Sequence, residues 1–309
     1  MSNYMEYSYK SCGGGKIHVH KWVPDCEASG VVQIVHGIAE HGRRYDDFAR
    51  YLTDFGFVVV AEDHMGHGKS VDETVGYFNG GWFAAVEDTY QLLKDTKAEY
   101  PDKPYILFGH SMGSFMARTI LINHPDSNIS GAIICGTGWQ PAPILKSGIA
   151  MAKAVCAMGD RKKPSSVLQK LMFGTYNARV EHPKTAYDWL TRSEEQVSAY
   201  IADPMCGFVP AAGLACDMLQ GIDHIQKKSN LLKMNRQLPV LFVAGGDDPV
   251  GNYGEGVRKT AEYFEKAGME DVTTKIYPLC RHEILNELNH KEIYLDILNW
   301  IQSKINSPE

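Results

Sequence analysis

Hydrophobic and polar residues alternate near the start of the chain in two short runs, residues 4–10 and 16–23, which flank three consecutive glycines at 13–15. A period of two residues is typical of a half-buried strand, and glycines between two such runs are typical of a turn. The pattern therefore predicts a β-hairpin at the edge of a sheet.

Farther along, short apolar runs rich in β-branched residues alternate with stretches whose apolar residues recur every three or four positions. One such stretch contains Phe83, Val86, Tyr90 and Leu93. The first pattern is typical of buried strands and the second of amphipathic helices. Because alternating strands and helices require crossover connections, we expect an α/β fold with a mostly parallel, doubly wound sheet covered on both faces. The expected strands are 31–37, 57–61, 105–108, 129–135, 239–245 and 272–277, and the expected helices are 45–55, 82–98, 112–123, 254–267 and 290–305.

This alternation stops between about residues 139 and 235, where the pattern is helical throughout. An insertion between two parallel strands stands on the edge where the strands end, above any site at that edge. We therefore expect a core of residues 1–138 and 236–309 and a helical cap of residues 139–235. Within the cap, segment 144–158 is apolar around much of its circumference. That surface fits a lipid acyl chain or a transient membrane contact, and equally fits packing on neighbouring helices.

The composition of the chain mainly argues against certain partners and sites. Hydrophobic residues make up 44% of the chain, and its net charge of −6 gives no electrostatic reason to expect nucleic acid as a partner. No uninterrupted apolar stretch reaches about 18 residues, so no stable membrane insertion is expected. The seven cysteines are odd in number and lack a Cys-x-x-Cys pair, and the N-terminal residues lack a signal-peptide pattern. We expect a cytoplasmic protein with no metal and no cofactor; the oligomeric state stays open.

One of the apolar runs, 105–108, leads into the sequence Gly-His-Ser-Met-Gly at 109–113. If a helix follows, Ser111 occupies the tight turn between strand and helix and holds its hydroxyl out at the carboxyl edge of the sheet, where a nucleophile belongs. Small neighbours are required there because the serine backbone is strained and a flanking side chain would collide with the strand or helix. In a chain with 29 glycines about 0.15 copies of Gly-x-Ser-x-Gly are expected by chance, so the motif alone proves little. Its context must therefore carry the interpretation.

Two later strands end at residues that would complete a catalytic triad. A serine at neutral pH needs a base within hydrogen-bond reach, and that base needs an orienting acid. The strand at 239–245 is followed by Asp247 and Asp248, and the strand at 272–277 is followed by His282. The order serine, aspartate, histidine is the order of the α/β-hydrolase topology. On placement alone, both aspartates remain candidates for the acid.

An acyl-transfer site also needs two backbone N–H groups for the oxyanion. The residue after the nucleophile, Met112, is expected to supply one, and the loop after the strand at 31–37 the other. Gly37 would let that loop turn its amides inward, which makes the N–H of Ile38 the second donor. His36 is expected to brace the loop rather than act as a base.

These motifs together resemble the monoacylglycerol lipase and lysophospholipase-like branch of the α/β-hydrolases, often grouped with serine aminopeptidase-like hydrolases. The resemblance rests on residues 36–45, 63–70 and 109–113 and covers about residues 28–138 and 236–305. It implies an α/β-hydrolase fold with a helical cap.

The same resemblance assigns the acid to Asp248, the last residue of a Gly-x-x-Asp turn, and the base to His282. It also places the oxyanion donors on Ile38 and Met112. Members of the family commonly continue the serine motif with a second glycine, where this chain has Ser114.

The activity that follows is the hydrolysis of a small-molecule acyl ester, including a lipid such as a monoacylglycerol or lysophospholipid, through an acyl-enzyme. A peptidase or amidase with the same triad, or an acyltransferase, remains an alternative. Glu40 and Arg44 are four residues apart, and this spacing predicts an ion pair that holds the oxyanion loop.

Overall fold

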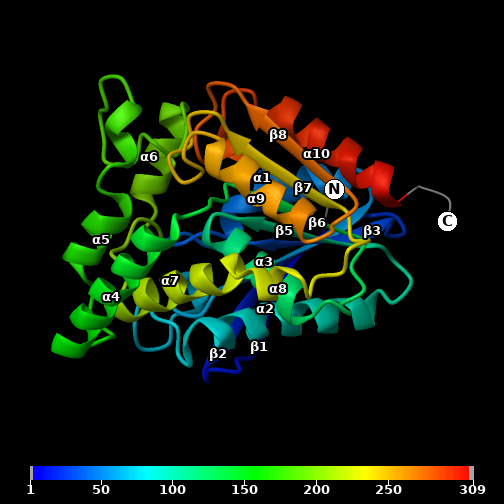
Figure 1. Ribbon diagram of the computed structural model, residues 1–309. Helices are drawn as coiled ribbons and strands as arrows, with labels where there is room; N and C mark the ends of the chain where they lie inside the picture. The colour runs from blue at the N-terminus through cyan, green and yellow to red at the C-terminus, as the bar shows by residue number, and fades with distance from the viewer. Residues whose placement is uncertain (1–2, 306–309) are drawn as a thin grey trace.

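The computed structural model describes residues 3–305, and within them eight strands form one sheet with helices on both faces (Figure 1). The strands are β1 Asn3–Lys10, β2 Lys16–Val23, β3 Gly30–Val35, β4 Phe57–Asp63, β5 Tyr105–His110, β6 Gly131–Cys135, β7 Val240–Gly245 and β8 Val272–Tyr277. The helices are α1 Asp46–Asp54, α2 Gly81–Glu99, α3 Met112–Asn123, α4 Ala142–Met158, α5 Ser166–Phe173, α6 Glu194–Ala202, α7 Ala212–Gln226, α8 Lys228–Leu231, α9 Glu255–Lys266 and α10 His290–Ile305. Short 3-10 turns lie at Gly42–Tyr45, Gly68–Ser70, Tyr176–Arg179 and Ile284–Asn286.

The strand order is β1-β2-β4-β3-β5-β6-β7-β8. Strands β1 and β2 form an antiparallel hairpin, and β2 also pairs antiparallel with β4. Every pair from β4 to β8 in the strand order is parallel. The mostly parallel α/β sheet predicted from the sequence is confirmed, and so is the hairpin at its edge.

The central strands β3 to β7 are buried along their whole length, which explains their continuous apolar runs. Helices α2, α3 and α9 cover one face of the sheet, and α1 and α10 cover the other (Figure 1). Within the described residues, none of these helices combines the length and apolar character needed to cross a bilayer.

The apolar stripe of α2 differs from the predicted one at its first position. Trp82 is buried, whereas Phe83 is 47% exposed. The Trp82 ring packs on α7 at Gly221, where an added β carbon would lie 2.3 Å from the ring. The partner surface, rather than the spacing of α2 itself, therefore selects which of the two adjacent aromatic residues is buried.

Residues 139–235, here called the helical insert, contain α4 to α8 and lie between β6 and β7. Helices α4, α5 and α6 gather on one side of the sheet (Figure 1). Helix α7 packs against α4 as well as against α2 and α3. The insert is therefore joined to the core through α7 as well as at its two ends.

The carboxyl ends of β3 and β5 form the place where a site can be built. These strands are neighbours, but the helix after β3 covers one face of the sheet and the helix after β5 covers the other. The chains that leave the two strands diverge, which opens a crevice at this edge. Gly37 and Ile38 follow β3, and Ser111 follows β5.

Candidate active site

Ser111 joins β5 to α3 with a backbone φ of +54° and ψ of −120°. Such a conformation costs a non-glycine residue about 1–3 kcal/mol and persists only where its surroundings enforce it. A β carbon on Gly109 would lie 2.5 Å from the carbonyl oxygen of Gly113, and one on Gly113 would lie 2.0 Å from that of Val35. Both glycines are therefore required by close backbone contacts, as the motif predicts.

Ser114 adds a hydrogen bond to this turn. Its side chain is buried, and its hydroxyl donates to the carbonyl oxygen of Ser111 at 2.6 Å. The Ser114 N–H donates to the same oxygen at 2.9 Å. A glycine at this position would supply only the second of these bonds, so the departure from the usual motif adds support for the strained turn.

His282 and Asp248 form a buried pair beside this turn. The imidazole Nδ1 of His282 lies 3.0 Å from Oδ2 of Asp248, while Oδ1 of Asp248 accepts the N–H of Val250 at 2.9 Å. Burial opposes protonation of the ring, but the Asp248 carboxylate outweighs it and raises the pKa of His282 above its ordinary value. Asp248 is fully buried and Asp247 is exposed, so the contact with His282 is made by the aspartate that the resemblance selects.

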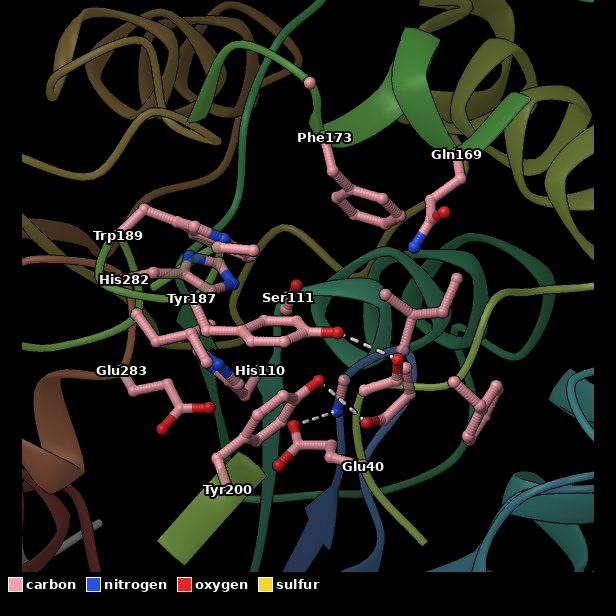
Figure 2. A pocket seen from close by; sticks show the side chains of 18 of the residues that line it. Glu40, His110, Ser111, Gln169, Phe173, Tyr187, Trp189, Tyr200, His282 and Glu283 are labelled. Atoms are coloured by element: carbon pink, nitrogen blue, oxygen red, sulfur yellow. Dashed lines mark hydrogen bonds between the residues drawn. The ribbon is translucent and has the colours of Figure 1, made fainter. Parts of the chain in front are cut away.

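Two aromatic rings flank the imidazole of His282. The ring centroid of Trp189 lies 5.1 Å away and that of His110 lies 4.7 Å away. Burial, followed by the neighbouring His282, lowers the pKa of His110 to about 4. His110 is therefore neutral near pH 7 and adds no positive charge beside His282. Figure 2 shows Trp189, His282 and His110 on the same side of Ser111.

The loop after β3 is fixed by its own side chains. The N–H of Gly37 donates to Oε1 of Glu40 at 2.6 Å, and a β carbon on Gly37 would lie 2.6 Å from that oxygen and 3.1 Å from the β carbon of Ser111. Gly37 thus needs to be glycine, and its amide is already used. Ile38 and Met112, the two expected oxyanion donors, line a cavity together with Ser111.

Arg44 connects this loop to the residue after His282. Its Nη1 donates to Oε2 of Glu40 at 2.7 Å, and its two terminal nitrogens donate to the Glu283 carboxylate at 2.7 and 2.8 Å. Burial would raise the pKa of Glu283, but the Arg44 guanidinium prevails and lowers it to about 2. The Glu40–Arg44 pair expected from the spacing is present. Glu283 is a third member that the spacing did not indicate.

The helical insert is hydrogen-bonded to both loops. The N–H groups of His282 and Glu283 donate to the carbonyl oxygens of Trp189 and Leu190, at 3.4 and 2.7 Å. On the other side, the carbonyl oxygen of Ala39 accepts two further hydrogen bonds from the insert, both at 2.9 Å, donated by the Tyr200 hydroxyl and the Gly207 N–H. The insert therefore contributes to the support of the site.

Two cavities meet at Ser111. The first has a volume of about 200 Å³ and a mixed lining, and the second has a volume of about 250 Å³ and a mostly apolar lining. Both touch Ile38, Phe173 and Trp189. Figure 2 shows Ser111 between Phe173 and Gln169 on one side of the first cavity and Tyr200 and Glu40 on the other. Apolar residues of the second cavity are Phe115, Leu145, Met151, Met218, Leu219 and Ile222.

Comparison with known proteins agrees with this geometry. The family model described as serine aminopeptidase, S33, matches residues 26–289. The chain belongs to this family. A monoacylglycerol lipase from Mycolicibacterium smegmatis is 30% identical to it, over 97% of this chain and 98% of that protein. The human monoglyceride lipase is 26% identical over 92% of this chain and 86% of that protein.

A solved structure resembles the chain over nearly all of its length. A thermostable carboxyl esterase from Bacillus coagulans superposes with a TM-score of 0.88 and 31% identity, over 99% of this chain and all of that one. The chain is therefore an enzyme of the α/β-hydrolase fold, related to monoacylglycerol lipases.

Sequence reasoning missed three residues that shape the site. Glu283 shares Arg44 with Glu40, Trp189 packs beside His282, and Tyr200 bonds to Ala39. A signal existed only for Glu283, because it directly follows the predicted base. Trp189 and Tyr200 lie in the insert, and the sequence does not say which insert residues face the crevice.

Proposed function

We propose that this chain is a serine hydrolase that cleaves carboxylic esters, of the monoacylglycerol or lysophospholipid lipase or carboxylesterase type. The observation that carries the proposal is the junction of the two cavities at Ser111, beside the buried His282–Asp248 pair. Relatives named as monoacylglycerol lipases and a carboxyl esterase support the same class of reaction.

The proposed reaction proceeds through an acyl-enzyme. Oγ of Ser111 attacks the ester carbonyl carbon while Nε2 of His282 takes its proton and passes it to the leaving alcohol. Asp248 holds the Nδ1–H of the ring and stabilises the imidazolium. The N–H groups of Ile38 and Met112 bind the oxyanion. Water then attacks the acyl-enzyme, its proton passes through His282 to Ser111, and the acid leaves. No cofactor takes part in these steps.

The two cavities differ in lining, and each suits a different half of the ester. The apolar cavity suits an acyl chain, because burial of methylene groups is favourable at about 0.8 kcal/mol each. The mixed cavity is lined by the Gln169 amide and by the hydroxyl oxygens of Tyr187 and Tyr200, which already donate to backbone carbonyls and can accept hydrogen bonds. This lining suits a polar alcohol such as glycerol or its phosphodiesters. A monoacylglycerol or lysophospholipid has both halves.

We further propose that residues 139–235 act as a cap over the site and contact a lipid surface transiently. Ile144 and Met151 of α4 line the apolar cavity, yet they are 61% and 47% exposed. Met158, at the end of the same helix, is 82% exposed. The apolar surface is therefore continuous from the outside of α4 into the cavity, which fits an ester delivered from a lipid phase.

The name of the family raises the alternative of an aminopeptidase. That activity requires an anionic group for the free α-amino group of a peptide. Within the part of the chain that the structure describes, two carboxylates line the mixed cavity, those of Glu40 and Glu283. Both are paired with Arg44. This pairing favours an uncharged ester over an α-amino substrate.

The test is a series of p-nitrophenyl esters and monoacylglycerols of increasing acyl length, offered in solution and in vesicles, beside aminoacyl anilides. We expect kcat/KM to rise with chain length and to be higher for vesicle-bound than for dissolved long esters. Ser111→Ala should fold normally but lose nearly all hydrolysis and fluorophosphonate labelling. A preference for anilides, or labelling that survives in the variant, would contradict the proposal.

A further inference from the structure

A histidine, an aspartate and a cysteine meet where the loop after β3 touches the helical insert. His41 lies in that loop, and Asp203 and Cys206 lie in the turn after α6. Each offers one donor atom, and the three atoms all lie within 4.8 Å of one another. None of the three belongs to the proposed catalytic triad.

The turn after α6 fixes two of these residues. The Cys206 N–H donates to the carbonyl oxygen of Asp203 at 3.0 Å, and the Met205 N–H donates to Oδ1 of Asp203 at 2.8 Å. The remaining carboxylate oxygen, Oδ2, lies 2.9 Å from Nε2 of His41. Asp203 therefore directs one oxygen into its own turn and the other toward the imidazole.

His41 is held by this one contact. Its second ring nitrogen, Nδ1, is buried and has no hydrogen-bond partner among the described residues. A cation that binds Nε2 moves the ring proton to Nδ1 and breaks only the hydrogen bond between His41 and Asp203.

The donor atoms are those that Zn²⁺ prefers. Thiolate, imidazole and carboxylate are its usual protein ligands, and tetrahedral bond lengths place the ligand atoms about 3.3–3.7 Å apart. The His41–Asp203 separation of 2.9 Å needs to open slightly, and Sγ of Cys206 needs to close by up to about 1 Å. The Asp203 side chain is 27% exposed, which leaves room for water as a fourth ligand.

The negative charge beside the three donor atoms comes from Asp203, because the carboxylates of Glu40 and Glu283 are already paired with Arg44. Together, the Asp203 carboxylate and the Cys206 thiolate would supply two negative charges to a divalent cation. A bound metal would in turn stabilise the thiolate.

A second group of metal-ligating side chains, Glu6, His18 and His20 on β1 and β2, is less suited to this role. The Glu6 carboxylate already binds the ammonium group of Lys69 at 2.6 Å. The Tyr4 hydroxyl lies 2.7 Å from Nδ1 of His20. Both of these groups would have to leave before a metal could enter.

We propose that His41, Asp203 and Cys206 form a binding site for one Zn²⁺ ion. Binding releases the thiol proton of Cys206 to water and moves the ring proton of His41 from Nε2 to Nδ1, so that the thiolate and Nε2 can both bind the metal. It joins the loop after β3 to the insert, two segments that already share the hydrogen bond from Gly207 to Ala39. The site is separate from Ser111, and metal binding does not depend on the proposed hydrolysis.

The test uses tag-free, chelator-treated full-length protein titrated with Co²⁺, which takes the place of Zn²⁺ and gives a thiolate-to-metal charge-transfer absorption. We expect this band to saturate at one equivalent and to disappear when Zn²⁺ is added, because Zn²⁺ binds more tightly. Zn²⁺ should also raise the Tm of the wild-type protein.

Matched variants identify the ligands. Cys206→Ser should lose the band, whereas a double variant of the exposed cysteines, Cys12→Ser and Cys26→Ser, should keep it. Asp203→Asn retains the thiol and should weaken Co²⁺ binding by more than about tenfold. Far-UV circular dichroism and the Tm of each metal-free variant check that it is folded. The absence of a band in the wild type, or a band that persists in Cys206→Ser, would overturn the proposal.

Discussion

His36 donates a hydrogen bond from Nδ1 to the carbonyl oxygen of Gly37 at 2.7 Å. Its other nitrogen, Nε2, accepts the backbone N–H of His64 at 3.0 Å, which assigns the proton of the neutral ring to Nδ1. Burial holds the pKa of His36 well below its ordinary value, so the ring stays neutral. In a trans peptide the C=O and N–H groups point in opposite directions. By holding the Gly37 carbonyl, His36 therefore turns the Ile38 N–H to the opposite side, away from itself.

From this relationship we predict that His36→Ala lowers kcat by about 10²-fold with little change in KM, because the misplaced Ile38 N–H stabilises the oxyanion less well. His36→Asn, which keeps an N–H donor near Nδ1, should recover part of the loss. Steady-state kinetics with one soluble ester measures the effect. The control is His67→Ala, another buried histidine of the same cluster, which bonds to Met65 instead of Gly37. Equal losses in the two alanine variants would contradict a positioning role.

The pair of His282 and Asp248 predicts the pH dependence of hydrolysis. Only the neutral ring can accept the serine proton, so kcat/KM should fall as the pH drops through the pKa of His282. Because Asp248 raises that pKa, the acid limb should lie above the ordinary histidine value of about 6.5. Asp248→Asn removes the charge, so the limb should move to lower pH while kcat falls by about 10⁴-fold.

The neighbouring residue provides the control for this experiment. Asp247 is exposed, and Asp247→Asn should leave both the acid limb and kcat close to those of the wild type. A larger loss in Asp247→Asn than in Asp248→Asn would mean that the acid has been assigned to the wrong residue.

Arg44 should be among the most destabilising sites for substitution. Arg44→Met leaves the buried carboxylates of Glu40 and Glu283 unpaired, and removing one partner of a buried ion pair costs about 3–5 kcal/mol. Denaturant unfolding at pH 7 measures this loss. The exposed pair of Arg50 and Asp46 provides the comparison, and Arg50→Met should cost no more than about 1 kcal/mol.

The same variant has a predicted dependence on pH. In the wild type, the lowered pKa of Glu283 means that its ionised form stabilises the fold above the ordinary glutamate pKa, and that this contribution is lost as the pH falls toward about 2. Without Arg44, burial raises the pKa instead, so protonation relieves the penalty. The difference in unfolding free energy between Arg44→Met and wild type should therefore be smaller at pH 5 than at pH 7. A difference that is constant with pH would argue against the unpaired carboxylate.

The strands were predicted closely because their signal is local. Residues 105–108 are the first four residues of β5, and 272–277 match β8 at both ends. Both runs are rich in β-branched or aromatic residues and are followed by Gly109 or Pro278, so neighbouring sequence alone locates them. The aromatic pair at the start of α2 shows the limit of this reasoning. Trp82 and Phe83 are equally apolar, and only the surface of α7 decides between them.

Contacts between distant segments account for what the sequence did not predict. His41 lies far along the chain from Asp203 and Cys206, so no local pattern in the sequence indicates that these three side chains meet. Glu283 directly follows the predicted base, but the sequence did not indicate it as a partner of Arg44, because the spacing rule that found Glu40 applies only within one turn of helix. Tertiary contacts of this kind depend on how the insert packs on the core.

The hydrogen bonds from His282 and Glu283 to the insert restrict how substrate reaches Ser111. Residues 189 and 190 cannot swing away without pulling on the loop that carries the base. Helices α4 and α5 pack on α7 through apolar side chains, and the loop between them is held to the start of α7 by the N–H groups of Ala212 and Gly213. An entrance opened by displacement of α4 and α5 would break these contacts and leave those between His282 and Asp248 in place. Admission of substrate would then be separate from the positioning of His282.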